Sequence, residues 1–160
     1  MTTRDDDRKF MARAIELAQT GVDQNAGGPF GCVIVKDGKI IGEGCNQVTS
    51  TNDPTAHAEV VAIRNACRNL NSFQLDGCTV YTSCEPCPMC IGAIYWARPA
   101  AIYFAGTRAD AAAAGFDDEM FYNEIEKPND ERKLRMAGLM RDESRRVFEN
   151  WSLKPNKIKY

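Results

Sequence analysis

Histidine is almost absent from this chain, which has a single one, His57, in 160 residues. A Cys₂His₂ zinc finger uses two imidazoles, so one copy of the chain cannot form it. Positive charge is not in excess either, since 20 Lys and Arg stand against 22 Asp and Glu, a net charge of −2. Proteins that bind nucleic acid through its phosphates usually carry a basic face. We therefore expect no nucleic-acid partner.

Long apolar runs are also missing. No stretch approaches the roughly 18 consecutive apolar residues of a membrane-spanning helix, and residues 1–7 contain no apolar core of a secretory signal. We expect no membrane partner and a cytoplasmic location. In a reducing compartment, the seven cysteines are expected to be buried thiols or metal ligands rather than disulfides.

The length fits one domain over residues 1–160. Apolar residues at helical spacing predict a helix over about 5–20. Asp37-Gly38 predicts a hairpin between two β-branched runs. A second helix, capped by Thr55, is expected to begin near His57. A strand, a short helix and a strand then predict a parallel crossover. Strands are predicted over 30–36, 39–45, 78–83 and 100–105. The second helix is expected to end near Leu70, and the short helix of the crossover covers 88–97.

The last third of the chain is harder to assign. Residues 107–132 predict a short helix and a loop over the site, and 134–140 a fifth strand. A helix over 142–151 and an extended tail over 152–160 are expected to follow. The fold class is therefore α/β, with three α/β/α layers around a central, mixed, five-stranded sheet.

Two segments carry the chemistry, His57-Ala-Glu59 and Pro86-Cys87-Pro-Met-Cys90. Each lies at a predicted helix start, where the helix dipole favours thiolates. Two thiolates and one imidazole leave the fourth zinc position open for water, as in catalytic sites. We therefore predict Zn²⁺ as the cofactor, held by His57, Cys87 and Cys90. Glu59 can approach the metal-bound water without being a ligand.

Each half of this pattern has another interpretation. A His-x-Glu is common, and a Cys-x-x-Cys can be a redox pair or half of a structural zinc site. Cys84 is a conceivable third thiolate, but we interpret it as a buried thiol at a strand end. The combination favours catalysis: zinc activates a water for attack on an sp² carbon that bears an amino group. Glu59 then acts as the catalytic general base and acid.

The two segments, together with Gly27-Gly-Pro-Phe-Gly31, Ile94-Tyr-Trp-Ala-Arg-Pro99 and Gly115-Phe-Asp-Asp118, resemble the cytidine deaminase superfamily, and within it the bacterial guanine deaminases. The resemblance implies hydrolysis of guanine at C2 to xanthine and ammonia, with Glu59 shuttling protons. It also implies a homodimer in which the tail 152–160 is exchanged and Tyr160 covers the partner's site. The substrate contacts that it implies are Asn46, Asp118, Phe30, Trp96, Tyr160 and Ala58.

Other functions stay open at this point. Guanosine, an ammeline-like triazine or a tRNA adenosine offers a similar site of attack, although the negative net charge disfavours RNA. A silent zinc-binding module is the alternative outside enzymes, and Glu59 argues against it because a structural site has no use for that carboxylate. After residue 132 the sequence gives no local motif match, so the exchanged tail depends on the rest of the resemblance.

Overall fold

The structure is a computed structural model that describes residues 4–160. It divides into two compact units. The N-terminal unit ends at Asp118, and the C-terminal unit is Glu119–Tyr160.

The N-terminal unit contains every helix and strand that the sequence predicts before residue 107. The hairpin turn has positive φ at both Asp37 (49°) and Gly38 (71°), the conformation that a type I′ turn requires. The elements are α1 (Arg4–Asp23), β1 (Gly31–Lys36), β2 (Lys39–Cys45), α2 (Val48–Thr51), α3 (Ala58–Leu70), β3 (Thr79–Cys84), α4 (Pro88–Ala97), β4 (Ala101–Gly106) and α5 (Arg108–Ala113).

The strands form one mixed sheet in the order β2-β1-β3-β4. Strand β1 is antiparallel to both neighbours, and β3 and β4 are parallel, as the predicted crossover requires. The prediction of a fifth strand over 134–140 was wrong, because these residues form no strand and the sheet of the described chain has four. They belong to the C-terminal unit, which contains no other strand with which they could pair.

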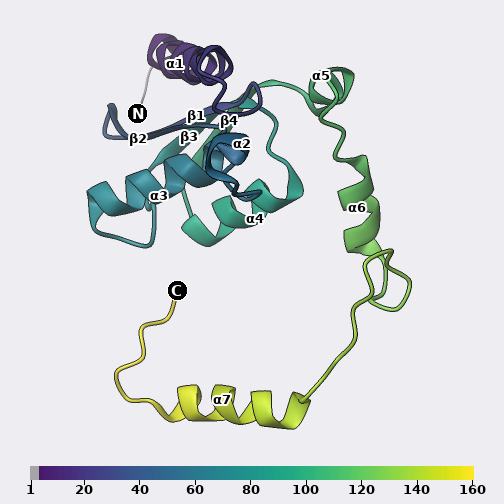
Figure 1. Cartoon of the computed structure of the whole chain (residues 1–160). Helices are drawn as coiled ribbons and strands as arrows, with labels where there is room; N and C mark the ends of the chain where they lie inside the picture. The colour runs from purple at the N-terminus through teal and green to yellow at the C-terminus, as the bar shows by residue number, and fades with distance from the viewer. Residues whose placement is uncertain (1–3) are drawn as a thin grey trace. The chain divides into compact units, whose positions relative to one another are not determined.

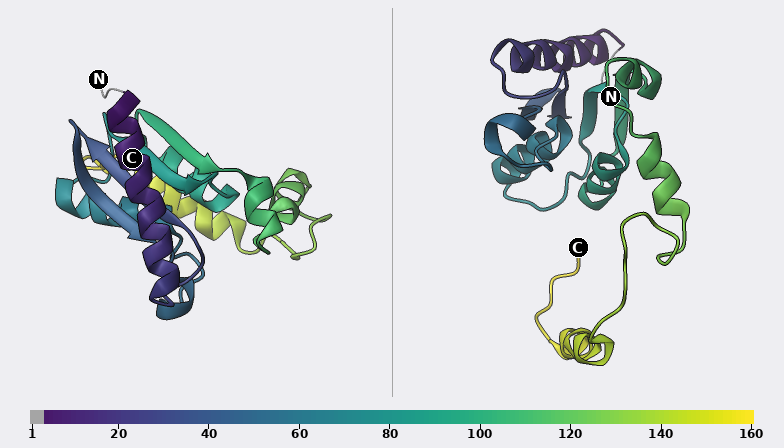
Figure 2. Two further views of the ribbon diagram at one scale, coloured as in Figure 1. Left: turned by 90° about the horizontal axis from the view of Figure 1, so that it is seen from above. Right: turned by 45° about the vertical axis from the view of Figure 1, so that its right-hand side comes forward.

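Helices cover both faces of the sheet, so the predicted layers are confirmed (Figures 1 and 2). The side chains of β1 alternate between two cores, as the strand period requires. Cys32 and Ile34 pack in the core that includes Ala62 of α3. Val33 and Val35 lie in the other core, which includes residues of α1. Helix α1 therefore covers one face, and α3 covers the other.

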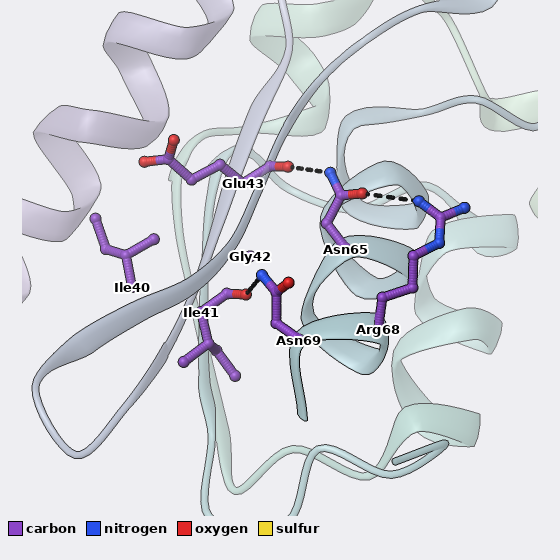
Figure 3. Close-up of a pocket in the computed structure, with 7 residues that line it drawn as sticks. All are labelled: Ile40, Ile41, Gly42, Glu43, Asn65, Arg68 and Asn69. Carbon is purple, nitrogen blue, oxygen red and sulfur yellow. Dashed lines mark hydrogen bonds between the residues drawn. The ribbon is translucent and has the colours of Figure 1, made fainter. Parts of the chain in front are cut away.

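Helix α3 is fixed closely against the edge strand β2. A Cβ on Gly44 would lie 2.5 Å from the Ala58 carbonyl oxygen at the start of α3, so only glycine permits this approach. Farther along α3, the side-chain amides of Asn65 and Asn69 donate to the β2 carbonyls of Glu43 and Ile41, at 2.9 and 2.8 Å (Figure 3). They border a hollow of about 470 Å³. These contacts fix where α3 begins on the sheet.

The C-terminal unit consists of α6 (Glu119–Glu126), α7 (Arg141–Leu153) and irregular segments. The helix predicted over 142–151 is therefore confirmed. No residue of this unit is buried. Among the described residues, no helix is long and apolar enough to cross a membrane. The exposed apolar side chains of α7 and the tail are Val147, Phe148, Trp151, Leu153, Ile158 and Tyr160.

Candidate active site

His57 stands directly before the first turn of α3, as its N-cap residue, with an extended backbone (φ −66°, ψ 153°). The prediction that Thr55 caps this helix was wrong. The Thr55 hydroxyl donates instead to Asp53 Oδ1 at 2.6 Å, and the Thr55 N–H donates to the same oxygen. The Asp53 carboxylate forms a local turn before the helix, which directs the hydroxyl away from it. The His57 side chain makes no cap hydrogen bond either.

Helix α4 begins in the same way. Cys87 is its N-cap residue, makes no side-chain cap hydrogen bond, and is followed by Pro88. Proline suits the first helical position because it has no N–H to leave unpaired. Cys90 lies within the first turn and is buried. The two helix starts therefore present one imidazole and two thiols.

These three side chains meet at one place. His57 Nδ1 lies 3.6 Å from Cys87 Sγ and 3.5 Å from Cys90 Sγ, and all three ligand atoms lie within 4.8 Å of one another. Tetrahedral zinc with ordinary Zn–S and Zn–N bonds separates nitrogen from sulfur by about 3.5 Å. The cluster therefore fits zinc. Cys84 is not part of it and directs its sulfur to the Thr107 carbonyl at 3.6 Å.

Protonation within the cluster is shared. A hydrogen bond from Cys90 lowers the pKa of the Cys87 thiol to about 4 and raises the pKa of Cys90 itself. The hydrogen bond to Cys87 raises the pKa of His57. The cluster thus favours one thiolate with protons on its neighbours. A divalent cation replaces such protons when it binds, which makes its affinity depend on pH.

Glu59 is the second residue of α3 and is only 6% exposed. Burial raises the pKa of its carboxyl, while hydrogen bonds from its own N–H and from Cys90 oppose this effect. A carboxyl whose pKa is raised holds an accepted proton more readily and can later return it. Its contact with Cys90 places it beside the cluster, and it is not one of the three clustered ligands.

Asn46 follows the end of β2 and is 5% exposed. Its Oδ1 accepts from the backbone N–H of Gly28 (3.2 Å) and Val48 (3.1 Å). A Cβ on Gly27 would lie 2.2 Å from that oxygen, so glycine is required there. Because Oδ1 is occupied, the amide is oriented, and Nδ2 is the atom left to donate to a bound molecule.

The segment 115–118 reaches the same part of the unit. The Phe116 ring meets the ring of Phe30 edge-on, with centroids 5.0 Å apart, beside Gly28. Asp118 pairs with Arg108, with 3.3 Å between Nε and Oδ1. The structure therefore brings Phe30, and the segment that ends in Asp118, next to the loop that orients Asn46. The sequence offered no signal for Arg108, since an Arg ten residues before an Asp follows no recognised spacing.

The three other predicted substrate contacts differ in how exposed their side chains are. Ala58 has no exposed surface and packs in the core beneath α3. Trp96 lies on α4 with 64% of its surface exposed. Tyr160 belongs to the C-terminal unit and is also largely exposed.

Comparison with known proteins agrees with this geometry. Residues 4–106 match the family model of the cytidine and deoxycytidylate deaminase zinc-binding region. Guanine deaminase of Bacillus subtilis is 56% identical over 94% of this chain and 97% of its own. The X-ray structure of guanine deaminase from Bacillus subtilis matches with a TM-score of 0.94 at 53% identity, covering 99% of both chains.

A second relative is a tRNA-specific adenosine deaminase of Buchnera aphidicola, 37% identical over 91% of this chain and 93% of its own. It is less similar than the guanine deaminase. The resemblance to bacterial guanine deaminases is thus confirmed over nearly the whole length. The family model alone covers well over half of the chain, and the chain belongs to the cytidine and deoxycytidylate deaminase family.

Proposed function

We propose that this protein is a zinc-dependent guanine deaminase that hydrolyses guanine to xanthine and ammonia. The observation that carries the proposal is the buried Glu59 carboxyl beside the cluster of His57, Cys87 and Cys90. A structural metal site needs no acid or base next to it, whereas hydrolytic deamination does. The similarity to the guanine deaminase of Bacillus subtilis supports the choice of substrate.

Two proton transfers must accompany the reaction. Zinc held by His57, Cys87 and Cys90 would lower the pKa of a water molecule toward about 7 and so make it a nucleophile. Glu59 would accept a proton from the attacking water as its oxygen bonds to C2, and would pass this proton to the adjacent ring nitrogen. The second water proton follows the same route to the amino group. The C–N bond then breaks, ammonia leaves, and C2 becomes the carbonyl of xanthine.

Recognition is assigned to Asn46 and Asp118. The orientation of Asn46 presents its Nδ2 donor, which suits an acceptor on the edge of guanine that carries the carbonyl group. Asp118 accepts from the N–H donors of the base. A base with the opposite pattern would leave these groups unpaired at a substantial cost in free energy. Phe30 is assigned to the face of the ring, with Phe116 packed against it.

The protein is further proposed to be a cytoplasmic homodimer in which residues 152–160 are exchanged and Tyr160 covers the partner's site. Exposed apolar side chains in both units support this assembly. Besides those of α7 and the tail, four aromatic residues of α4 and of the edge strand β4 are exposed. They are Tyr95, Trp96, Tyr103 and Phe104. A second copy would remove such surfaces from water.

The test is ammonia release by zinc-loaded protein from guanine, guanosine, ammeline, cytosine and adenine, each at several concentrations. We expect the highest kcat/KM for guanine, with xanthine as the product. A tRNA anticodon stem-loop with adenosine at the wobble position belongs in the same panel, because of the relative from Buchnera aphidicola. Faster conversion of that RNA, or no loss of guanine, would refute the proposal.

A further inference from the structure

We infer that Arg108 is a positioning residue that sets the orientation of the Asp118 carboxylate toward the substrate. The inference rests on the proposed function, because it is the recognition of guanine that gives Asp118 its role. Arg108 and Asp118 are joined at 3.3 Å between Nε and Oδ1. The contact uses one carboxylate oxygen, so Oδ2 is the oxygen directed to a donor on the base.

Arg108 is itself fixed in place by local structure. It is the first residue of α5, directly after the N-cap Thr107. Thr107 and Asp110 form a reciprocal capping box: the Thr107 N–H donates to Asp110 Oδ2 at 2.8 Å, and the Asp110 N–H donates to Thr107 Oγ1 at 3.3 Å. Such a box defines the backbone at a helix start. The guanidinium therefore extends from a defined position.

A second contact links the Arg108 backbone to the segment that contains Cys87. The Arg108 backbone N–H donates to Glu85 Oε2 at 3.1 Å, and Glu85 lies two residues before Cys87. The Glu85 N–H in turn donates to the Gly106 carbonyl at 2.8 Å. One residue thus relates the segment that holds a zinc ligand to the carboxylate that reads the substrate. The contact to Glu85 uses only backbone atoms of Arg108, so a side-chain substitution leaves it in place.

The arrangement has a functional reason. Asp118 lies near the end of an irregular segment after Gly115, which has a φ of 93°. An aspartate in such a segment loses rotamer freedom when it binds a ligand. A charge-assisted hydrogen bond from Arg108 fixes the carboxylate beforehand. Its loss should weaken substrate binding rather than slow the proton transfers made by Glu59.

A double-mutant cycle tests this inference. Guanine KM, kcat and zinc content are measured for the wild type, Arg108→Met, Asp118→Ala and the double variant, with Arg108→Lys as the conservative change. We expect Arg108→Met to raise KM about tenfold with kcat changed by less than about threefold. In the Asp118→Ala background the same substitution should change KM by less than about twofold. Arg108→Lys should restore part of the loss.

Arg68→Met is the matched control. Arg68 is exposed and bonds Asn65 on α3, so its replacement should leave KM, kcat and zinc content unchanged. Equal losses from Arg108→Met in both backgrounds would overturn the inference. Loss of zinc, or a reduced kcat, on Arg108→Met in both backgrounds would also overturn it, because either result would show that Arg108 has a structural role near Glu85. A wild type that does not deaminate guanine would instead remove the proposed function, and this inference with it.

Discussion

The two units of the chain differ in how they treat apolar side chains. The N-terminal unit buries them in two cores, one on each face of a four-stranded sheet. The C-terminal unit buries none of its residues. A segment with so little internal packing has little free energy with which to order itself. The contrast indicates that the first unit supplies its own stability, whereas the second requires a surface to pack on.

The candidate site residues are also distributed unequally between the two units. The cluster of His57, Cys87 and Cys90 lies in the N-terminal unit, together with Glu59, Asn46 and Asp118. Tyr160 is the only proposed site residue in the other unit. Four changes to the chain test this difference between the two units.

The largest effect is expected at Glu59. Glu59→Gln removes the proposed proton carrier and keeps the shape of the side chain, so turnover of guanine should fall by about 10²–10⁴-fold. Zinc content should stay at one ion per chain, because Glu59 is not among the clustered ligands. Steady-state kinetics and metal analysis on the same preparation test both statements. Near-normal turnover would remove Glu59 from the mechanism.

Valine provides a matched pair across the two units. Val33 is 0% exposed and Val147 is 67% exposed. Val33→Ala should lower the free energy of unfolding by about 2 kcal/mol, because it leaves a cavity. Val147→Ala should change it by less than about 0.5 kcal/mol in a dilute sample. Urea unfolding at two protein concentrations measures both.

The concentration series sharpens the comparison. If α7 packs on a second copy, the effect of Val147→Ala should grow as the protein becomes more concentrated, while that of Val33→Ala should not. Equal effects of the two substitutions at low concentration would show that the C-terminal unit has a core of its own.

Removal of the tail tests the other side of the division. Deletion of Ile158–Tyr160 should lower kcat/KM by about tenfold, a change of about 1.4 kcal/mol in activation free energy, with zinc content unchanged. These residues are largely exposed, so the loss should come from an incomplete site rather than from unfolding. Unchanged kinetics would confine the whole site to the N-terminal unit.

The smallest effect is expected at the Arg13–Glu43 pair, which links α1 to β2 at 2.8 Å. The hydrogen bond from Arg13 lowers the pKa of Glu43, so the pair stabilises the fold above the unfolded pKa of about 4.3. This contribution disappears as pH falls through the lower, folded pKa. Glu43→Gln should therefore cost less than about 1 kcal/mol near pH 7, and the cost should shrink as pH falls below the unfolded pKa. A constant cost across this range would mean that the charge is irrelevant.

Local patterns predicted much of the N-terminal unit. Asp37-Gly38 identified the hairpin because few other residue pairs accept two positive φ angles. The spacing of Cys87 and Cys90, at a helix start marked by proline, identified two members of the cluster. Their approach to His57 could be proposed from chemistry, but the distance depends on how α3 and α4 pack on the sheet.

The failures have one physical origin. Thr55 is of the right type for a helix cap, yet α3 begins only at Ala58 with His57 as its N-cap residue, and the Thr55 hydroxyl bonds Asp53 instead. Residues 134–140 contain apolar side chains, yet a strand needs a neighbour that their unit lacks. Arg108 finds Asp118 only after the fold brings them together. In each case, the partner that decides the outcome lies outside the local pattern.

The hold on Asn46 has a consequence for how substrate preference can evolve. Two backbone N–H groups fix Oδ1, and a backbone does not change when its side chains do. Replacement of Asn46 by Asp would keep that oxygen in place and convert the other atom from donor to acceptor. A single nucleotide change in the gene suffices for this replacement. In the proposed role of Asn46, this loop would let a lineage exchange one base-recognition pattern for its opposite while the backbone around the side chain stays the same.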